Sequence, residues 1–524
     1  MKHIFGLLVL VLMPCIVIAQ DPAIQWQKSY GGSTADYVYS MIKTSDSGFA
    51  FTGWTLSHDG DASDNQSTRG VSLWVVKLNF SGVLQWHKCF GGKRGDDMGS
   101  SIIQTSDGGY IVAGETRDSE ISRFKGDYDI WVIRLDSKGN ILWNKLYGGS
   151  GGDYANAIIQ TSDGGFAVAG YTNSSDGDVT GRTYGLDDFW IIKLDSVGVI
   201  EWQECYGGSS LDQPSSIIQT FDKGFLVAGL TGSRDHDVSD NNGYDDAWII
   251  KLNSIGHLEW QKCFGGIGYE LTSAQSIIQI ADSGFIILGT TNAADTIFSG
   301  NHGKYDVWVA KLDSHGSTEW LKIYGGSNDD YAASLIHSSD GGYAFAGTTY
   351  SGGEGVNHGA TDYWVVKLNS SGDMQWQRFL GGTDQDDAAS IVQAFDGGYV
   401  IGGWSGSKDG DVIGNTGGRN AWIVKLLPVN GVPEFPKLSD AEVFLSPNPS
   451  NGIGKISYNL ANFSPVKIEV YNALGERLRI LLSENEVAGI HEHGFDLSDL
   501  SSGKYFFRMQ IDGKSVMKGI EIMK

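Results

Sequence analysis

The chain has few of the residues that crosslink a backbone, kink it or attract polyanions. Of its 524 residues only 4 are Cys and 9 are Pro, and Asp and Glu outnumber Lys and Arg by 62 to 38, for a formal net charge of −24. The cysteines form no C-x-x-C pair, which argues against a disulfide framework or a metal cluster. The acidic balance argues against a nucleic-acid partner, because a polyanion would be repelled.

Long apolar runs are also scarce. The one candidate, Leu7 to Ile18, is too short to span a bilayer comfortably and follows a basic start at Lys2. We therefore predict a signal peptide over residues 1–19 and no transmembrane segment in the mature chain, with Cys15 leaving a lipoprotein as the alternative. No segment has sustained helical periodicity, so we expect an all-β protein.

Glycine and tryptophan are abundant instead, with 73 Gly and 16 Trp. Fourteen of the tryptophans form two series with intervals of 56 to 60 residues. The first series is Trp26, Trp86, Trp143, Trp202, Trp260, Trp320 and Trp376, and the second is Trp74, Trp131, Trp190, Trp248, Trp308, Trp364 and Trp422. The chain therefore contains seven copies of a unit of about 58 residues.

Each copy has the pattern of four short strands. In the third copy, strand-like runs cover 157–161, 166–172, 188–194 and 200–203, and an Asp-Gly turn joins the first two runs. A long polar loop separates the second run from the third. Four antiparallel strands per repeat predict one blade of a β-propeller.

The phase of the repeats indicates how the ring closes. Trp26 lies on a strand of the fourth type in the repeat, but strands of the first three types do not precede it. The last copy ends at Leu426 after its third strand, without a fourth. We predict that residues 20–427 form a seven-bladed β-propeller. Its N-terminal strand completes the last blade, which removes two open sheet edges.

Proline marks the end of the repeats. Only Pro214 occurs between residues 23 and 427, whereas five prolines fall between Pro428 and Pro449. We predict a linker over residues 428–441 and a small C-terminal β-sandwich over residues 442–524, a region without tryptophan.

The last 80 residues carry a set of motifs in a specific order. They are Ser446–Gly452 (SPNPSNG), Val470–Gly475 (VYNALG), Ala488–His491 (AGIH), Leu500–Arg508 (LSSGKYFFR) and the basic terminus. This region resembles the type A C-terminal sorting domain of type IX secretion in Bacteroidetes. The matching motif residues are Pro447, Asn448, Pro449, Gly475, Gly489, Gly503, Tyr505 and Lys524.

The resemblance implies Sec export, followed by outer-membrane translocation by the type IX secretion machinery. It further implies removal of the tail, and release of the protein or its attachment to the cell surface. The repeats are similar to propeller repeats of secreted proteins from the same bacteria. Their L-D-x-x-G-x-x-x-W stretch, Leu135 to Trp143, resembles the tryptophan-docking motif of quinoprotein propellers. That likeness implies at most a related fold and does not imply a quinone cofactor.

One acidic residue follows each Gly-Gly pair by four positions. These residues are Asp36, Asp96, Asp153, Asp212, Glu270, Asp330 and Asp386. They belong to the connections that, with the long loops, form one face of the propeller. One interpretation is a carboxylate that caps a turn in every blade. The other is a ring of carboxylates near the central channel that attracts a cation or a cationic ligand.

Alternating aspartates in the long loops suggest a second hypothesis. Asp59, Asp61, Asp235, Asp237 and Asp240 could bind Ca²⁺ weakly, because carboxylate oxygens are its preferred ligands. None of these loops completes an EF-hand pattern, so solvated turn residues are the alternative.

The near-identity of the blades favours a non-enzymatic binding module for an extracellular glycan or protein. We further expect a monomer without a cofactor, unless Ca²⁺ binds. A secreted glycan-active enzyme with its site on the long-loop face is one alternative, and a structural surface component is another. No catalytic residues are assigned.

Overall fold

The computed structural model describes residues 21–524 with short gaps. The residues outside the description are 1–20, 122–123, 182, 242, 267–271, 295–296, 352–357, 429–443, 447–449, 461–463, 473–476, 487–488, 512–513 and 523. The predicted signal peptide and most of the predicted linker therefore lie outside the described residues.

Seven four-stranded antiparallel sheets follow one another along the chain. Blade 1 has β2 (Asp36–Lys43), β3 (Phe49–Thr55), β4 (Ser72–Leu78) and β5 (Leu84–Phe90); blade 2 has β6 (Asp97–Gln104), β7 (Tyr110–Thr116), β8 (Asp129–Leu135) and β9 (Ile141–Tyr147); blade 3 has β10 (Asp153–Gln160), β11 (Phe166–Thr172), β12 (Asp188–Leu194) and β13 (Ile200–Tyr206); blade 4 has β14 (Asp212–Gln219), β15 (Phe225–Thr231), β16 (Asp246–Leu252) and β17 (Leu258–Phe264). Blade 5 has β18 (Thr272–Gln279), β19 (Phe285–Thr291), β20 (Asp306–Leu312) and β21 (Thr318–Tyr324); blade 6 has β22 (Asp330–His337), β23 (Tyr343–Thr349), β24 (Asp362–Leu368) and β25 (Met374–Leu380); blade 7 has β26 (Asp386–Gln393), β27 (Tyr399–Ser405), β28 (Asn420–Leu426) and β1 (Ile24–Tyr30).

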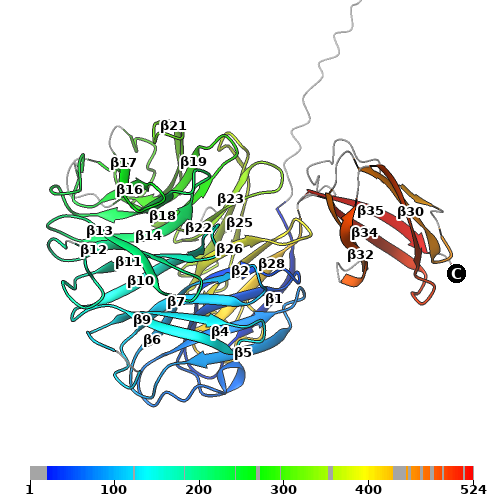
Figure 1. Cartoon of the computed structure of the whole chain (residues 1–524), viewed down its shortest axis with the longest axis horizontal. Coiled ribbons are helices and arrows are strands. Elements are labelled where there is room, and N and C mark those ends of the chain that lie inside the picture. The colour runs from blue at the N-terminus through cyan, green and yellow to red at the C-terminus, as the bar shows by residue number, and fades with distance from the viewer. Residues whose placement is uncertain are drawn as a thin grey trace, which may run out of the picture.

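The sheets form a closed ring, as Figure 1 shows. The first strand of each blade contacts the first strands of both neighbouring blades, and β26 contacts β2. The first strands are therefore innermost, and the predicted seven-bladed propeller is confirmed. A short 3-10 helix, Gly60–Ala62, lies in the long loop of blade 1.

The N-terminal strand closes the ring as predicted. β1 pairs antiparallel with β28, with Trp26 opposite Lys425 and Tyr30 opposite Ala421. The indole nitrogen of Trp422 donates to Oε1 of Gln27 at 2.7 Å. Pairing with β1 covers the edge of β28 and gives blade 7 four strands, like the other blades.

Side chains between adjacent blades make up the cores. One cluster joins Ile111 and Val132 of blade 2 to Trp190 of blade 3. The third-strand tryptophans are 0–5% exposed. The continuous burial of the third strands explains why they read as apolar runs with little alternation.

The fourth-strand tryptophans make the contacts between blades at the outer edge. Six of the seven pack on a glycine in the last hairpin turn of the next blade, where φ lies between +68° and +87°. The pairs are Trp26 with Gly82, Trp86 with Gly139, Trp143 with Gly198, Trp202 with Gly256, Trp260 with Gly316 and Trp320 with Gly372. A Cβ at these glycines would lie within 3 Å of the indole, so both the turn and the packing require glycine.

Two further sheets form the C-terminal region, at the orange-to-red end of the chain in Figure 1. One sheet contains β29 (Phe444–Ser446), β30 (Ile453–Leu460) and β33 (Gly489–Asp496); the other contains β31 (Ser464–Asn472), β32 (Arg477–Glu486), β34 (Gly503–Ile511) and β35 (Lys514–Ile522). Ile456 and Phe495 of the first sheet share one core with Ile468 and Phe507 of the second. Among the described residues, the structure contains no helix with the length and apolar character needed to cross a membrane.

Candidate functional site

The repeated acidic residue begins the innermost strand in five of the seven blades. These residues are Asp36, Asp153, Asp212, Asp330 and Asp386, and each is at most 1% exposed. Asp153 is representative: its carboxylate accepts hydrogen bonds from the Thr172 hydroxyl, from Ser174 Oγ at 2.8 Å and from the Gly149 backbone N–H at 2.8 Å. These contacts tie the inter-blade turn to the end of the second strand. The geometry of these five residues is that of the turn-capping alternative.

Of the other two candidates, Asp96 does not begin a strand, and Glu270 cannot be compared. In blade 2 the connection is one residue longer, so Asp97 begins the strand and receives the Thr116 hydroxyl. Asp96 instead accepts the backbone N–H of Val71 at 3.2 Å. Glu270 lies outside the described residues. Counting from Gly-Gly fails in blade 2 because it assumes a constant loop length.

Burial raises the pKa of these capping carboxyls. It raises the pKa of Asp97, which begins the strand in blade 2, to about 7. A second set of buried aspartates begins the third strands, where burial raises the pKa of Asp129 to about 6 and that of Asp188 to about 7. A Cβ on Gly207 would lie 2.1 Å from Asp188 Oδ1 and 2.7 Å from Asp212 Oδ2, so these two carboxyls flank one glycine. Desolvation and the neighbouring like charge both favour the protonated form.

The loop aspartates of the calcium hypothesis cap the same turns from the opposite side. Asp59 accepts the Ser33 N–H at 2.8 Å, and Asp235 accepts the Ser209 N–H at 2.8 Å. Asp61 and Asp237 accept the N–H groups of Gly31 and Gly207, both at 3.3 Å. Asp240 has a positive φ of 67°. Within the described part of the chain, these aspartates are not part of a group of three or more metal-ligating side chains.

Variation between blades begins one residue after the capping aspartate. This position and its cross-strand partner on the second strand lie at the long-loop end of the two innermost strands. The seven pairs are Tyr37 with Trp54, Met98 with Glu115, Tyr154 with Tyr171, Gln213 with Leu230, Ser273 with Thr290, Tyr331 with Thr348, and Asp387 with Trp404. These pairs differ from blade to blade, although the capping aspartate beside them recurs in five of the seven blades.

One group of these side chains lies where blade 7 meets blade 1. We call Tyr37, Trp54, Trp404 and Arg419 the closure cluster. Tyr37 stacks on Trp54 with ring centroids 4.3 Å apart and lies 5.0 Å from Trp404. The Arg419 guanidinium lies 4.7 Å from the centre of the Trp404 ring and donates to the Tyr37 hydroxyl at 2.9 Å. The three rings are half-buried and Arg419 is exposed. Solvent therefore reaches a rigid set of aromatic faces beside a cation.

Three tyrosines form a similar group between blades 2 and 3. Tyr154 stacks on Tyr171 at 4.7 Å, and Tyr128 of blade 2 lies 5.0 Å from Tyr154. Glu115 is only 9% exposed, accepts the Ser100 hydroxyl at 3.1 Å and has its pKa raised to about 7 by burial. These residues were not predicted from the sequence, although the position after each repeated acid differs between copies.

The C-terminal region contains a different kind of cluster. Glu486, His491 and His493 are the only group of at least three metal-ligating side chains among the described residues. This group was not predicted from the sequence either. The signal was the alternation His-x-His, which places both imidazoles on one face of a strand.

The motif residues of the C-terminal region are partly described. Pro447, Asn448, Pro449 and Gly475 lie outside the described residues. Gly489 begins β33 and Gly503 begins β34. Tyr505 is 7% exposed and donates to the Ser501 carbonyl at 2.9 Å, and the Lys524 backbone N–H donates to Ser502 Oγ at 3.0 Å. The last residues of the chain are thus bound back onto the turn before β34.

Comparison with known families assigns this region. Residues 445–523 match the model of the secretion system C-terminal sorting domain. This region is a type IX sorting domain. The protein is therefore exported by type IX secretion and is either secreted or located at the cell surface, as the sequence motifs predicted.

The chain has more distant relatives. It is similar to the regulatory protein FlaEY of Caulobacter vibrioides, with 23% identity over 342 residues, 58% of this chain and 35% of that protein. The chain thus spans about a third of the length of this relative. Among solved structures, a puromycin hydrolase is 10% identical with a TM-score of 0.43, covering 83% of this chain and 62% of that one. The α-L-arabinofuranosidase Arb93A of Fusarium graminearum is 11% identical with a TM-score of 0.34, covering 76% and 98%.

Proposed function

We propose that the exported propeller is a non-enzymatic binding module, and that the closure cluster is its ligand site. The observation that carries the proposal is the arrangement of Tyr37, Trp54 and Trp404 around Arg419, at the long-loop end of the innermost strands. Rigid aromatic side chains that are half-exposed provide contact area at low entropic cost.

The chemistry of the cluster favours a glycan as the ligand. The apolar faces of sugar rings pack on Tyr and Trp rings, while an Arg beside them donates hydrogen bonds to hydroxyl or carboxylate oxygens. Arg419 also donates to Gln385 Oε1 at 2.8 Å, so its guanidinium is held in place on two sides. A protein ligand that buries the same aromatic surface is the competing outcome of the test below.

Glycan and protein arrays probed with the full-length chain test the proposal. Trp404→Ala should lower the affinity for the captured ligand at least tenfold, because it removes a stacking face and the support of Arg419. The control is Phe221→Ala, which removes an aromatic side chain that is 65% exposed in a hairpin turn at the opposite end of the strands. Equal binding by both variants would locate the site elsewhere. The same arrays with and without Ca²⁺ test the calcium hypothesis, which stays a proposal.

A glycan-active enzyme is the second candidate, and Glu115 is the observation that favours it. A carboxyl with a pKa of about 7 can act as a general acid near neutral pH, and Tyr154 and Tyr171 lie near it. Turnover of a polysaccharide panel that is lost in Glu115→Gln would support this candidate over binding alone. If neither binding nor turnover is detected, a structural surface component is the favoured function.

A further inference from the structure

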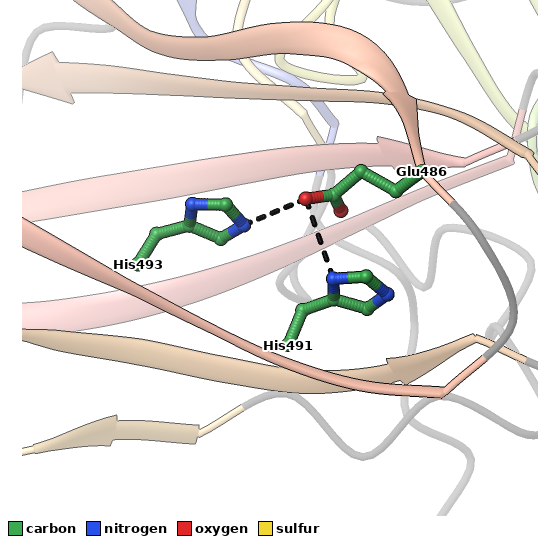
Figure 2. A group of neighbouring side chains, drawn as sticks. All are labelled: Glu486, His491 and His493. Carbon is green, nitrogen blue, oxygen red and sulfur yellow. Dashed lines mark hydrogen bonds and ion pairs between the residues drawn. The ribbon is translucent and has the colours of Figure 1, made fainter.

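Glu486, His491 and His493 converge from two different sheets of the sorting domain. Glu486 ends β32, while His491 and His493 lie two residues apart on β33. Figure 2 shows both imidazoles on the same side of β33, each turned toward one carboxylate oxygen of Glu486. The group therefore connects the two layers of the domain at one point.

The ligand atoms of the three side chains lie within 4.8 Å of one another, and two of their separations are close to those of a metal site. Oε1 of Glu486 is 3.4 Å from Nδ1 of His491 and 2.8 Å from Nε2 of His493. Ligand atoms about 2.0–2.1 Å from a tetrahedral Zn²⁺ lie about 3.3–3.4 Å apart. The first separation already has this value, and the second reaches it by a movement of about half an ångström, which a rotation of one side chain supplies.

The surroundings of the carboxylate support the same assignment. The Glu486 side chain is 8% exposed, whereas the two imidazoles are 17% and 28% exposed. The Tyr458 hydroxyl donates to the second oxygen, Oε2, and leaves Oε1 directed at the imidazoles. The rings of His491 and His493 are nearly parallel, with 4° between their planes, and both stack against the Tyr458 ring. Tyr458 thus fixes all three side chains, as outer-shell residues do in metal sites.

We propose that Glu486, His491 and His493 bind one divalent transition-metal ion, with Zn²⁺ as the expected ion. Two imidazoles and one carboxylate are a donor set that suits Zn²⁺, and a fourth position remains for water or an exogenous ligand. The bound ion joins β32 to β33 and so clamps the two sheets of the sorting domain together. Because it binds the folded domain only, it stabilises that fold.

The test is a Zn²⁺ titration of the full-length chain after treatment with a chelator, followed by calorimetry and by the absorption spectrum of the Co²⁺ form. We expect one equivalent to bind, a Co²⁺ spectrum of four-coordinate type, and an upward shift of the melting transition of the sorting domain. His491→Ala and His493→Ala should each abolish this stoichiometric binding. Tyr458→Phe keeps the ligands and should weaken binding by about 10–100-fold.

The matched control is Glu492→Gln. Glu492 lies between the two histidines on β33 but is exposed and pairs with Lys455 at 3.1 Å. This variant should bind Zn²⁺ as the wild type does. Melting curves in excess chelator, equal for wild type and variants, show that each variant folds; a variant that fails this check is replaced by its His→Asn counterpart. The proposal would be overturned if the wild type does not bind Zn²⁺, or if the His491→Ala/His493→Ala double variant binds it as well as the wild type. The three side chains would then form a hydrogen-bonded cluster only.

Discussion

Removal of the N-terminal strand tests the closure of the ring most directly. Deleting residues 21–30 takes β1 from blade 7 and exposes the edge of β28. It also removes the packing of Trp26 on Gly82 of blade 1 and the hydrogen bond that the Tyr30 hydroxyl donates to the Gly82 carbonyl at 2.5 Å. The deletion therefore breaks contacts both within blade 7 and between blades 7 and 1.

The expected loss follows from these contacts. Six residue pairs join β1 to β28, and at about 1 kcal/mol net per hydrogen bond they contribute about 5 kcal/mol. A half-buried tryptophan adds about 3 kcal/mol. The buried Nε1 of Trp422 loses its acceptor Gln27, which costs about 1–3 kcal/mol. The sum is about 10 kcal/mol, comparable to the whole stability of a typical domain at about 5–15 kcal/mol.

Thermal and urea unfolding, followed by tryptophan fluorescence, measure this effect. The truncated chain should lose its cooperative transition or show it at a much lower temperature. A synthetic peptide of residues 21–30 should restore the transition in a concentration-dependent way, because it binds the exposed edge of β28.

A comparison of two substitutions separates closure from packing. Trp26→Ala and Trp143→Ala remove equivalent contacts with Gly82 and Gly198. Both should lower the free energy of unfolding by about 3 kcal/mol. Only Trp26→Ala should speed hydrogen exchange in β28, since Trp26 lies on β1, which pairs with β28 but is not joined to it by a hairpin. An unchanged transition in the truncated chain would refute closure by β1.

Three further predictions concern the turns, the buried acids and the sorting domain. Gly198→Ala should cost more stability than Gly164→Ala, because both have positive φ (77° and 87°) but only the Cβ at position 198 would contact an indole, at 2.9 Å; urea melts with equal costs would contradict this. Burial raises the pKa of Asp188 from 3.8 to about 7, so the folded ring binds more protons than the unfolded chain, and its melting temperature should fall as the pH rises between about 4 and 7. Asp188→Asn should flatten that dependence, and a rise with pH would refute it. Deleting residues 442–524 should retain the protein in the periplasm, which immunoblotting of cell fractions and culture medium checks; export of the deleted chain would show that the sorting domain is dispensable.

The repeat made most of the architecture predictable. Two tryptophans per copy fixed the number of blades, and the unmatched strand around Trp26 indicated how the ring closes. The same reasoning failed for Asp96, because it assumed a constant loop length and one extra residue moved the cap to Asp97. The extra residue placed a different aspartate at the start of the innermost strand of blade 2, and the fold of the blade was unchanged.

The candidate sites were harder to predict because they depend on contacts between strands that are distant in sequence. Tyr37 and Trp404 are brought together only by closure of the ring. Glu486 belongs to one sheet of the sorting domain, while His491 and His493 belong to the other, so their spacing in the sequence does not show that they meet. Differences among the seven copies are the sequence signal for the closure cluster. The His-x-His pattern is the sequence signal for the group in the sorting domain.

The direction of the last propeller strand has a consequence for how a ligand reaches the protein. β28 begins at Asn420, beside the long loop of blade 7, and ends at Leu426, opposite Tyr399 at the hairpin end. The chain toward the sorting domain therefore leaves from the face opposite the closure cluster. Attachment to a cell through a segment that follows Leu426 would therefore join the propeller at its hairpin face and leave the closure cluster open to a ligand.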